Sequence, residues 1–178
     1  RALANALFLV EPRLRKEEVE VVRDRDDSGS TQTALVVLAD ANRLEQVLVN
    51  LLTNALDAML TCPVRKLSID VRIDAEDDTW VEIVVSDTGA GIPEAARERL
   101  FEPFFTTKPP GAGLGLGLAI SAGIMRELGG TLKADAPTAA GGASFTLRLR
   151  RAPGEMGAEG PLSDTNRAGH GAAYEEPR

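Results

Sequence analysis

Apolar residues recur with helical spacing in three parts of the chain. Leu3, Leu7, Val10 and Leu14 are three or four residues apart, which places them on one helix face. A longer helix is expected from Asp40, a residue type favoured at helix N termini, to about Leu60. Its apolar face consists of Leu44, Val47, Leu48, Leu51, Leu52, Ala55 and Met59. A third helix is predicted over residues 116–128, where two glycines stop it.

Short segments rich in apolar and β-branched residues predict strands between these helices. They are residues 19–22, 34–38, 68–73, 80–85, 131–134 and 144–149. Turn-like sequences at 24–29 and 74–78 separate the first two strands and the middle pair. A short helix is expected to begin at Pro93 and to be followed by an irregular segment to Lys108.

Composition limits the class of protein. The 178 residues suffice for one domain, and a content of 43% hydrophobic but only 4% aromatic residues predicts an aliphatic core. No apolar run approaches the roughly 20 residues of a membrane span, so we expect a soluble piece without direct membrane contact. The net charge of -7 argues against nucleic acid as a partner.

The two ends of the chain differ from its middle. The chain starts with Arg1 and lacks a secretory signal, so we interpret it as a fragment of a longer protein. Residues 152–178 contain frequent glycines and prolines and almost no large apolar residues, and we expect a disordered tail there. The ordered domain is therefore placed at residues 1–151.

The long helix carries a polar stripe opposite its leucines. Asn50, Asn54 and Asp57 lie at i, i+4 and i+7, so their side chains converge on one side of the helix. Amide oxygens are hard ligands suited to Mg²⁺, whose remaining ligands are waters and substrate phosphates. Taken alone, the stripe also fits an ordinary solvated helix face.

Two glycine-containing segments could hold the two ends of a nucleotide. Asp87 ends an apolar strand and precedes Gly89 and Gly91, where a carboxylate could accept the exocyclic amine of adenine. An Asp-x-Gly turn without function is the alternative at this position. Further along, glycines alternate between residues 111 and 117 and open a helix, whose N-terminal amides can bind phosphates.

Other nucleotide motifs do not fit the glycine run. The chain contains no Gly-Lys dipeptide, which excludes a Walker-type P-loop. A dinucleotide fingerprint fails because each register ends in leucine or isoleucine and the run follows Pro-Pro-Gly instead of a strand. Between the two glycine segments, residues 100–108 combine apolar anchors with Lys108, so this loop could close over bound phosphates.

These segments, in this order, resemble the ATP-binding catalytic domain of two-component sensor histidine kinases. The matching boxes are residues 50–58, 87–91, 101–108 and 113–118, and the likeness spans about residues 1–150. The last two boxes are similar to nitrogen-regulatory and C4-dicarboxylate sensor kinases. The resemblance, which extends to gyrase, heat-shock chaperones and MutL, implies a Bergerat-type α/β two-layer sandwich: a mixed, mainly antiparallel sheet with helices on one face.

The resemblance also implies roles for individual residues. Asn54 matches the asparagine that coordinates Mg²⁺, Asp87 the adenine-binding aspartate, and Lys108 a lid cation on the γ-phosphate, with the lid at about residues 94–115. Asn50 and Lys108 are the expected catalytic residues. The full set expected at ATP is Asn50, Asn54, Asp57, Asp87, Gly89, Gly91, Ile92, Thr106, Thr107, Lys108, Gly113, Leu114, Gly115, Leu116, Gly117 and Leu118.

Three positions qualify the resemblance. Asn50 stands where ATPases of the superfamily place a water-activating glutamate, and an amide cannot act as that base. Asp57 stands where many sensor kinases have lysine, and Ala143 where relatives often have threonine near the adenine. The first difference favours phosphoryl transfer over hydrolysis.

The activity implied by the resemblance is that of a protein-histidine kinase. With ATP and Mg²⁺, it would phosphorylate a histidine on an upstream helical dimerisation domain absent from this chain, and a response regulator receiver domain would be a further partner. The expected location is the cytoplasm, as part of a membrane-bound sensor. A serine kinase or ATPase of the same fold, or a non-catalytic nucleotide-binding module, are the alternatives.

Overall fold

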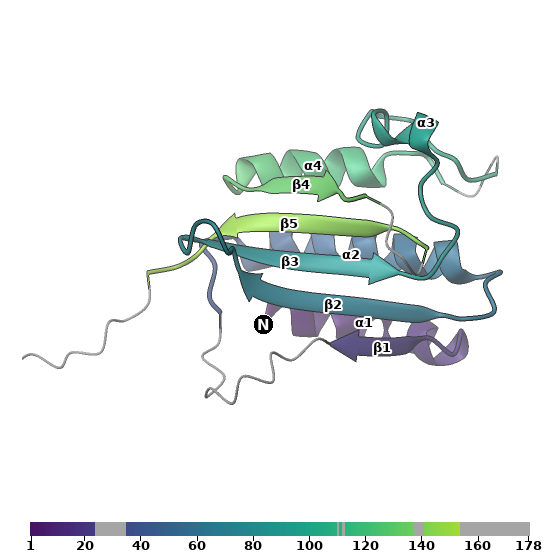
Figure 1. The fold of residues 1–178 in the computed structure, drawn as a ribbon, viewed down its shortest axis with the longest axis horizontal. Helices are drawn as coiled ribbons and strands as arrows, with labels where there is room; N and C mark the ends of the chain where they lie inside the picture. The colour runs from purple at the N-terminus through teal and green to yellow at the C-terminus, as the bar shows by residue number, and fades with distance from the viewer. Residues whose placement is uncertain (24–34, 110, 112, 137–140, 154–178) are drawn as a thin grey trace, which may run out of the picture.

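One mixed sheet forms one of the two layers of the molecule (Figure 1). The computed structural model describes residues 1–23, 35–109, 111, 113–136 and 141–153. The elements are α1 (Ala2–Lys16), β1 (Glu20–Arg23), α2 (Ala41–Met59), β2 (Lys66–Ile73), β3 (Trp80–Asp87), α3 (Glu94–Arg97), α4 (Gly117–Glu127), β4 (Thr131–Ala134) and β5 (Ser144–Arg150).

The sheet has five strands in the order β1-β2-β3-β5-β4. β1 pairs with β2 in parallel, which requires a crossover, and α2 lies in that connection. The remaining pairs are antiparallel. The arrangement confirms the predicted mixed, mainly antiparallel sheet.

The long helices lie together on one face of the sheet (Figure 1). α2 packs between α1 and α4 and also contacts β3, so it is the central helix of this layer. It begins where predicted, because Asp40 Oδ1 accepts the backbone N–H of Arg43 at 2.9 Å and caps the helix. The two-layer sandwich expected from the sequence is confirmed.

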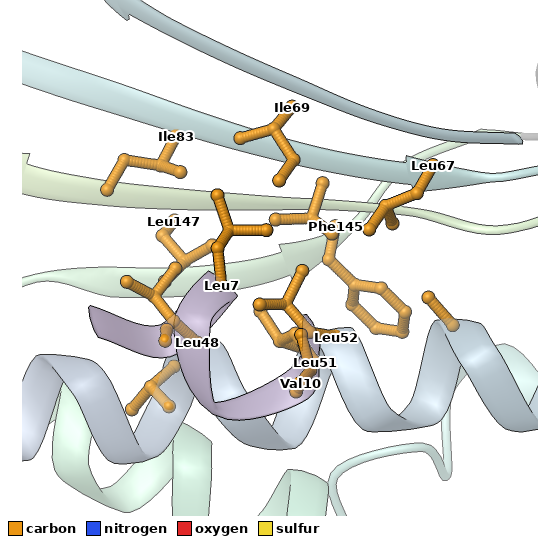
Figure 2. Close-up of a cluster of buried hydrophobic side chains, with 14 of the residues drawn as sticks. Leu7, Val10, Leu48, Leu51, Leu52, Leu67, Ile69, Ile83, Phe145 and Leu147 are labelled. Carbon is orange, nitrogen blue, oxygen red and sulfur yellow. The ribbon is translucent and has the colours of Figure 1, made fainter. Parts of the chain in front are cut away.

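The core between the layers is mainly aliphatic, and Phe145 of β5 is an aromatic residue within it (Figure 2). Helix residues such as Leu48 and Leu52 are fully buried and face Leu67 and Leu147 of the sheet. The alternating burial of β3 explains why its inward positions are Val81, Ile83 and Val85. The same alternation continues to Asp87, so a carboxylate follows three apolar residues on the inner face.

One strand prediction was wrong. Residues 35–38 form no strand; Val37 makes only an isolated antiparallel bridge with Arg151. Within the described chain, the backbone of residues 36–38 pairs only with residues 150–152, at and beyond the end of β5, and Val36 and Leu38 remain exposed. The apolar segment therefore predicted a strand where the structure has only a single bridge.

Some sequence predictions concern residues outside the described ranges. These are the turn at 24–29 and all of the predicted tail except residues 152 and 153. Ala152, which we assigned to the tail, donates its backbone N–H to Val36 O at 2.8 Å. Among the described helices, none has both the length and the apolar character needed to cross a bilayer.

Candidate active site

The polar stripe of α2 lies beside the buried leucines, as its spacing predicted. Asn50, Asn54 and Asp57 are each half-buried, whereas Leu51 and Leu52 are at most 1% exposed. The three polar side chains contact three different segments of the chain: Asn50 contacts α4, Asn54 contacts the loop after α3, and Asp57 contacts both that loop and α1. The stripe is thus a contact surface and not a bare solvated face.

Asp87 lies at the end of β3 and is only 6% exposed. Its Oδ1 accepts the backbone N–H groups of Gly89 at 2.8 Å and Ala143 at 3.2 Å. Burial raises the pKa of the Asp87 carboxyl, and these two hydrogen bonds limit the rise. No described residue donates to Oδ2, which leaves that oxygen able to accept from a ligand amine.

Two glycines bring backbone against Asp87. A Cβ at Gly89 would lie 2.7 Å from Ala58 Cβ and 2.8 Å from Asp87 Oδ1, so a side chain there would displace α2 or the carboxylate. Gly142 has φ +78°, and a Cβ on it would overlap the Asp87 carbonyl oxygen. Gly91 packs against Gly142 in turn. The carboxylate is therefore held in a close-packed backbone cradle.

Lys108 contacts the polar stripe at Asn54 and Asp57, in the turn of α2 that precedes Ala58. Its Nζ donates to Asp57 Oδ2 at 2.7 Å and to Asn54 Oδ1 at 3.2 Å. From the other side, Arg13 Nη2 of α1 donates to Asp57 Oδ1 at 2.9 Å. Asp57 is thus bracketed by two cations from different elements.

The charges around Asp57 change its titration. Burial by itself would raise the pKa of the Asp57 carboxyl, but the hydrogen bonds and charges of Lys108 and Arg13 outweigh burial and lower it. The side chains of all three residues remain roughly a third exposed, at 28% for Asp57, 34% for Lys108 and 36% for Arg13. The group is a partly solvated ion cluster in which partners can exchange.

The glycine run leads into α4 and contacts two of the other segments. Gly115 has φ +65°, and a Cβ there would lie 2.6 Å from the backbone of Phe104 and Phe105. Gly117 opens α4, and a Cβ on it would overlap the Asn50 carboxamide. No side chain of the described residues caps α4, so its first N–H groups are available for an anion.

The remaining predicted residues are placed less centrally. Thr106 Oγ1 accepts the Lys108 backbone N–H at 3.1 Å and thus shapes the loop. Thr107 and Leu114 are exposed, the latter at 78%. A Cβ added at Gly113 would lie 3.8 Å from the Lys108 side chain. Ile92 and Leu118 are partly buried and pack against the core.

Three contacting residues were missed by the sequence reasoning. Arg13 and Ser121 reach the stripe from helices 44 and 71 residues away, and no sequence signal marks such a contact. Gly142 did carry a signal, the Gly-Gly pair at 141–142 between two predicted strands, but no functional role was assigned to it from the sequence. Its closeness to Asp87 appears only once the sheet is assembled.

Comparison with known proteins identifies the family. The model described as histidine kinase-, DNA gyrase B-, and HSP90-like ATPase matches residues 39–153. The two-component sensor PprA of Pseudomonas aeruginosa is 40% identical over 160 residues, covering 88% of this chain and 16% of PprA. The C4-dicarboxylate transport sensor protein DctB of the same species is 39% identical, covering 94% of this chain and 26% of DctB. The chain thus spans only 16% and 26% of the length of these two relatives.

Solved structures lead to the same family. The catalytic domain of histidine kinase ThkA has a TM-score of 0.69 and 32% identity, covering 85% of this chain and 93% of that chain. ThkA has also been solved in complex with the response regulator protein TrrA, with 29% identity and a TM-score of 0.66, covering 86% of this chain and 40% of that chain. The chain therefore belongs to the histidine kinase-, DNA gyrase B-, and HSP90-like ATPase family, among the ATP-binding catalytic domains of two-component sensor histidine kinases.

Proposed function

We propose that this chain binds ATP with Mg²⁺ and transfers the γ-phosphoryl group to a histidine on a separate helical dimerisation domain. One observation carries the proposal: α2 connects two chemically different sites. Gly89, whose backbone N–H donates to Asp87 Oδ1, packs against Ala58, while the cation Lys108 contacts Asn54. Asn54 and Ala58 are four residues apart, or about 6 Å along a helix, so both sites are within reach of one nucleotide.

At the base end, Asp87 is the proposed anchor of adenine. Its Oδ2 would accept the exocyclic amine, while Oδ1 is already occupied by two backbone N–H groups. Gly89 and Gly91 keep side chains out of this region, and Ile92 is the neighbouring apolar residue. At the other end, the uncapped N terminus of α4 and the glycines at 113, 115 and 117 would receive the phosphates.

The residues present fit a magnesium ion. Asn54 Oδ1 already accepts a hydrogen bond from a cation, the ammonium of Lys108. The same oxygen could therefore coordinate a metal cation. No group of three His, Cys, Asp or Glu in the described residues could hold a metal, so waters and phosphate oxygens would complete the shell around Asn54. Bound Mg²⁺ would neutralise charge on the phosphate oxygens.

The proposed transfer requires positioning more than protein-based chemistry. A lone pair of the acceptor imidazole would form the N–P bond, the bond between the γ-phosphorus and the bridging oxygen would break with its electrons going to ADP, and the imidazole would lose its proton to solvent. Asn50 carries an amide where hydrolysis would need a base, which favours this acceptor over water. Lys108 would exchange Asp57 and Asn54 for the γ-phosphate.

The partners follow from the same proposal. The phosphoacceptor domain would precede this chain in the parent protein, and a response regulator receiver domain would take the phosphoryl group from it. The ThkA–TrrA complex supports the second partner for a related kinase. We further propose that the domain acts in the cytoplasm as part of a membrane-bound sensor.

The test combines this chain with the separately produced phosphoacceptor domain of its parent protein and γ-labelled ATP with Mg²⁺. We expect label to appear as acid-labile, base-stable phosphohistidine on the acceptor, and only in the presence of both proteins. Asp87→Asn serves as the binding-impaired control. Tight ATP binding without label on the acceptor would refute the kinase proposal, and release of inorganic phosphate by this chain alone would favour an ATPase.

A further inference from the structure

Ser121 is a buried polar residue outside the predicted site. It lies on α4 and is 2% exposed, and the buried polar residues of the described chain are otherwise only Asp87 and Ser144. Its Oγ accepts a hydrogen bond of 2.9 Å from Asn50 Nδ2 on α2. A buried hydroxyl in a helix could satisfy itself on its own backbone, so its contact with the polar stripe calls for an explanation.

The Asn50 side chain is enclosed from two sides by α4. Ser121 holds its amide nitrogen, and Gly117, the first residue of α4, leaves no space between its backbone and the carboxamide oxygen. Ser121 and Gly117 are four residues apart and therefore lie on the same face of α4. The carboxamide is thus fixed against the first turn of the helix, where phosphates are expected to bind.

We propose that Ser121 is a positioning residue that fixes the Asn50 carboxamide for its role at the phosphates of ATP·Mg²⁺. The inference rests on the proposed function, in which Asn50 acts at the nucleotide. A half-buried asparagine without this bond would populate several rotamers, and ordering it on binding would lower affinity. Because Ser121 already orders the Asn50 side chain in the free protein, this entropy loss does not occur on binding.

The bond also connects the two elements that hold the phosphates. α2 supplies Asn50 and Asn54, while α4 supplies the N-terminal amides, and the Asn50–Ser121 bond fixes one side chain of α2 to the second turn of α4. Correct spacing between these groups is what a phosphoryl-transfer site requires. A structural role in helix packing alone would instead stabilise the fold without acting through Asn50.

A double-mutant cycle on this chain separates the two roles. Calorimetry measures affinity for a non-hydrolysable ATP analogue with Mg²⁺, relative to ADP with a chelator, for wild type, Ser121→Ala, Asn50→Ala and the double variant. We expect Ser121→Ala to weaken the Mg²⁺ complex about three- to tenfold, the value of one hydrogen bond. In the Asn50→Ala background, the same change should have no further effect.

A spectroscopic measurement reports on the bond without any ligand. The side-chain amide resonances of Asn50 should shift and sharpen towards those of a mobile asparagine in Ser121→Ala. If that variant unfolds, Ser121→Cys keeps the volume but offers a weak sulfur acceptor, and it replaces alanine in every comparison. Ser144→Ala is the matched control, because it removes another buried hydroxyl, on β5, and should leave the relative Mg²⁺ affinity unchanged.

The outcomes separate this inference from the proposed function. Equal weakening in both Asn50 backgrounds, or unchanged Asn50 resonances, would overturn the positioning role. If the wild-type chain fails to bind the analogue at all, the proposed function fails first. If wild type binds the analogue but the effects of the two substitutions simply add, only the positioning role of Ser121 is refuted.

Discussion

The two ends of the candidate nucleotide site are built from different parts of the chain. At the adenine end, backbone N–H groups and two glycines surround one carboxylate that is 6% exposed. At the phosphate end, Asp57, Lys108 and Arg13 form ion pairs with side chains about a third exposed. The proposed adenine end is therefore already formed, whereas the proposed phosphate end is occupied by partners that a ligand would have to replace.

The two carboxylates also titrate in opposite directions. Burial raises the pKa of Asp87, while Lys108 and Arg13 overcome burial and lower the pKa of Asp57. Asp87 thus favours the folded state when protonated, and its contribution is lost as pH rises through its raised pKa. Asp57 stabilises the fold above the ordinary carboxyl pKa, and that contribution is lost as pH falls through its lowered pKa. Substitutions at each end test whether this difference holds.

The largest expected effect is at Gly142, where close packing is tightest. Gly142→Ala should lower the free energy of unfolding by about 2–4 kcal/mol, because the new Cβ strains a left-handed residue and overlaps Asp87. Chemical denaturation measures it. The control is Gly129→Ala, which has φ +70° but open space around it and should cost only about 1 kcal/mol. Equal losses would mean that contact with Asp87 is unimportant.

The next effect concerns the adenine anchor. Asp87→Asn should weaken ATP and ADP alike, by about 10- to 100-fold, because Oδ1 must accept two backbone N–H groups and the new amide would face the adenine amine. Calorimetry at several pH values checks it. In wild type, affinity should fall as pH drops through the raised pKa of Asp87. Titration of the nucleotide itself affects wild type and variant equally, so it cancels when the two affinities are compared at each pH. Unchanged ATP binding would remove Asp87 from the site.

A smaller and more selective effect is expected at Lys108. Lys108→Ala should weaken ATP about three- to tenfold but leave ADP nearly unchanged, because only the γ-phosphate would gain this cation. Part of the loss is offset, since the variant no longer has to break the contacts of Lys108 with Asp57 and Asn54. Lys108→Arg keeps the charge and is the control. Equal loss for both nucleotides would contradict the assignment of Lys108 to the γ-phosphate.

The smallest effect is the stability contribution of Asp57. Asp57→Asn should lower the free energy of unfolding at neutral pH by less than about 1 kcal/mol, because partly exposed ion pairs contribute little. The difference from wild type should disappear in acid, as wild-type Asp57 becomes protonated in both states. Denaturation at neutral and acid pH, with Asp78→Asn as an exposed control, measures it. A constant difference across pH would show that charge is not involved.

Local sequence patterns predicted most of the fold. Helical spacing and the Asp40 cap predicted α2, and the apolar segment at 80–85 predicted a strand with Asp87 at its end. The apolar run at 34–38 was predicted wrongly, since strand formation depends on whether a distant partner has a free edge, which local pattern does not reveal. Spacing also placed Asn50, Asn54 and Asp57 on one face, because a helix fixes that geometry by itself.

The sequence by itself thus determined which residues could act and in what order, because helix period, strand alternation and glycine backbone freedom are local properties. Only the tertiary structure decided their partners. Arg13 reaches Asp57, Ser121 reaches Asn50 and Gly142 reaches Asp87 across 44, 71 and about 55 residues, respectively. Such contacts follow from how the layers pack, and packing depends on the whole core, because no short segment contains both members of any pair.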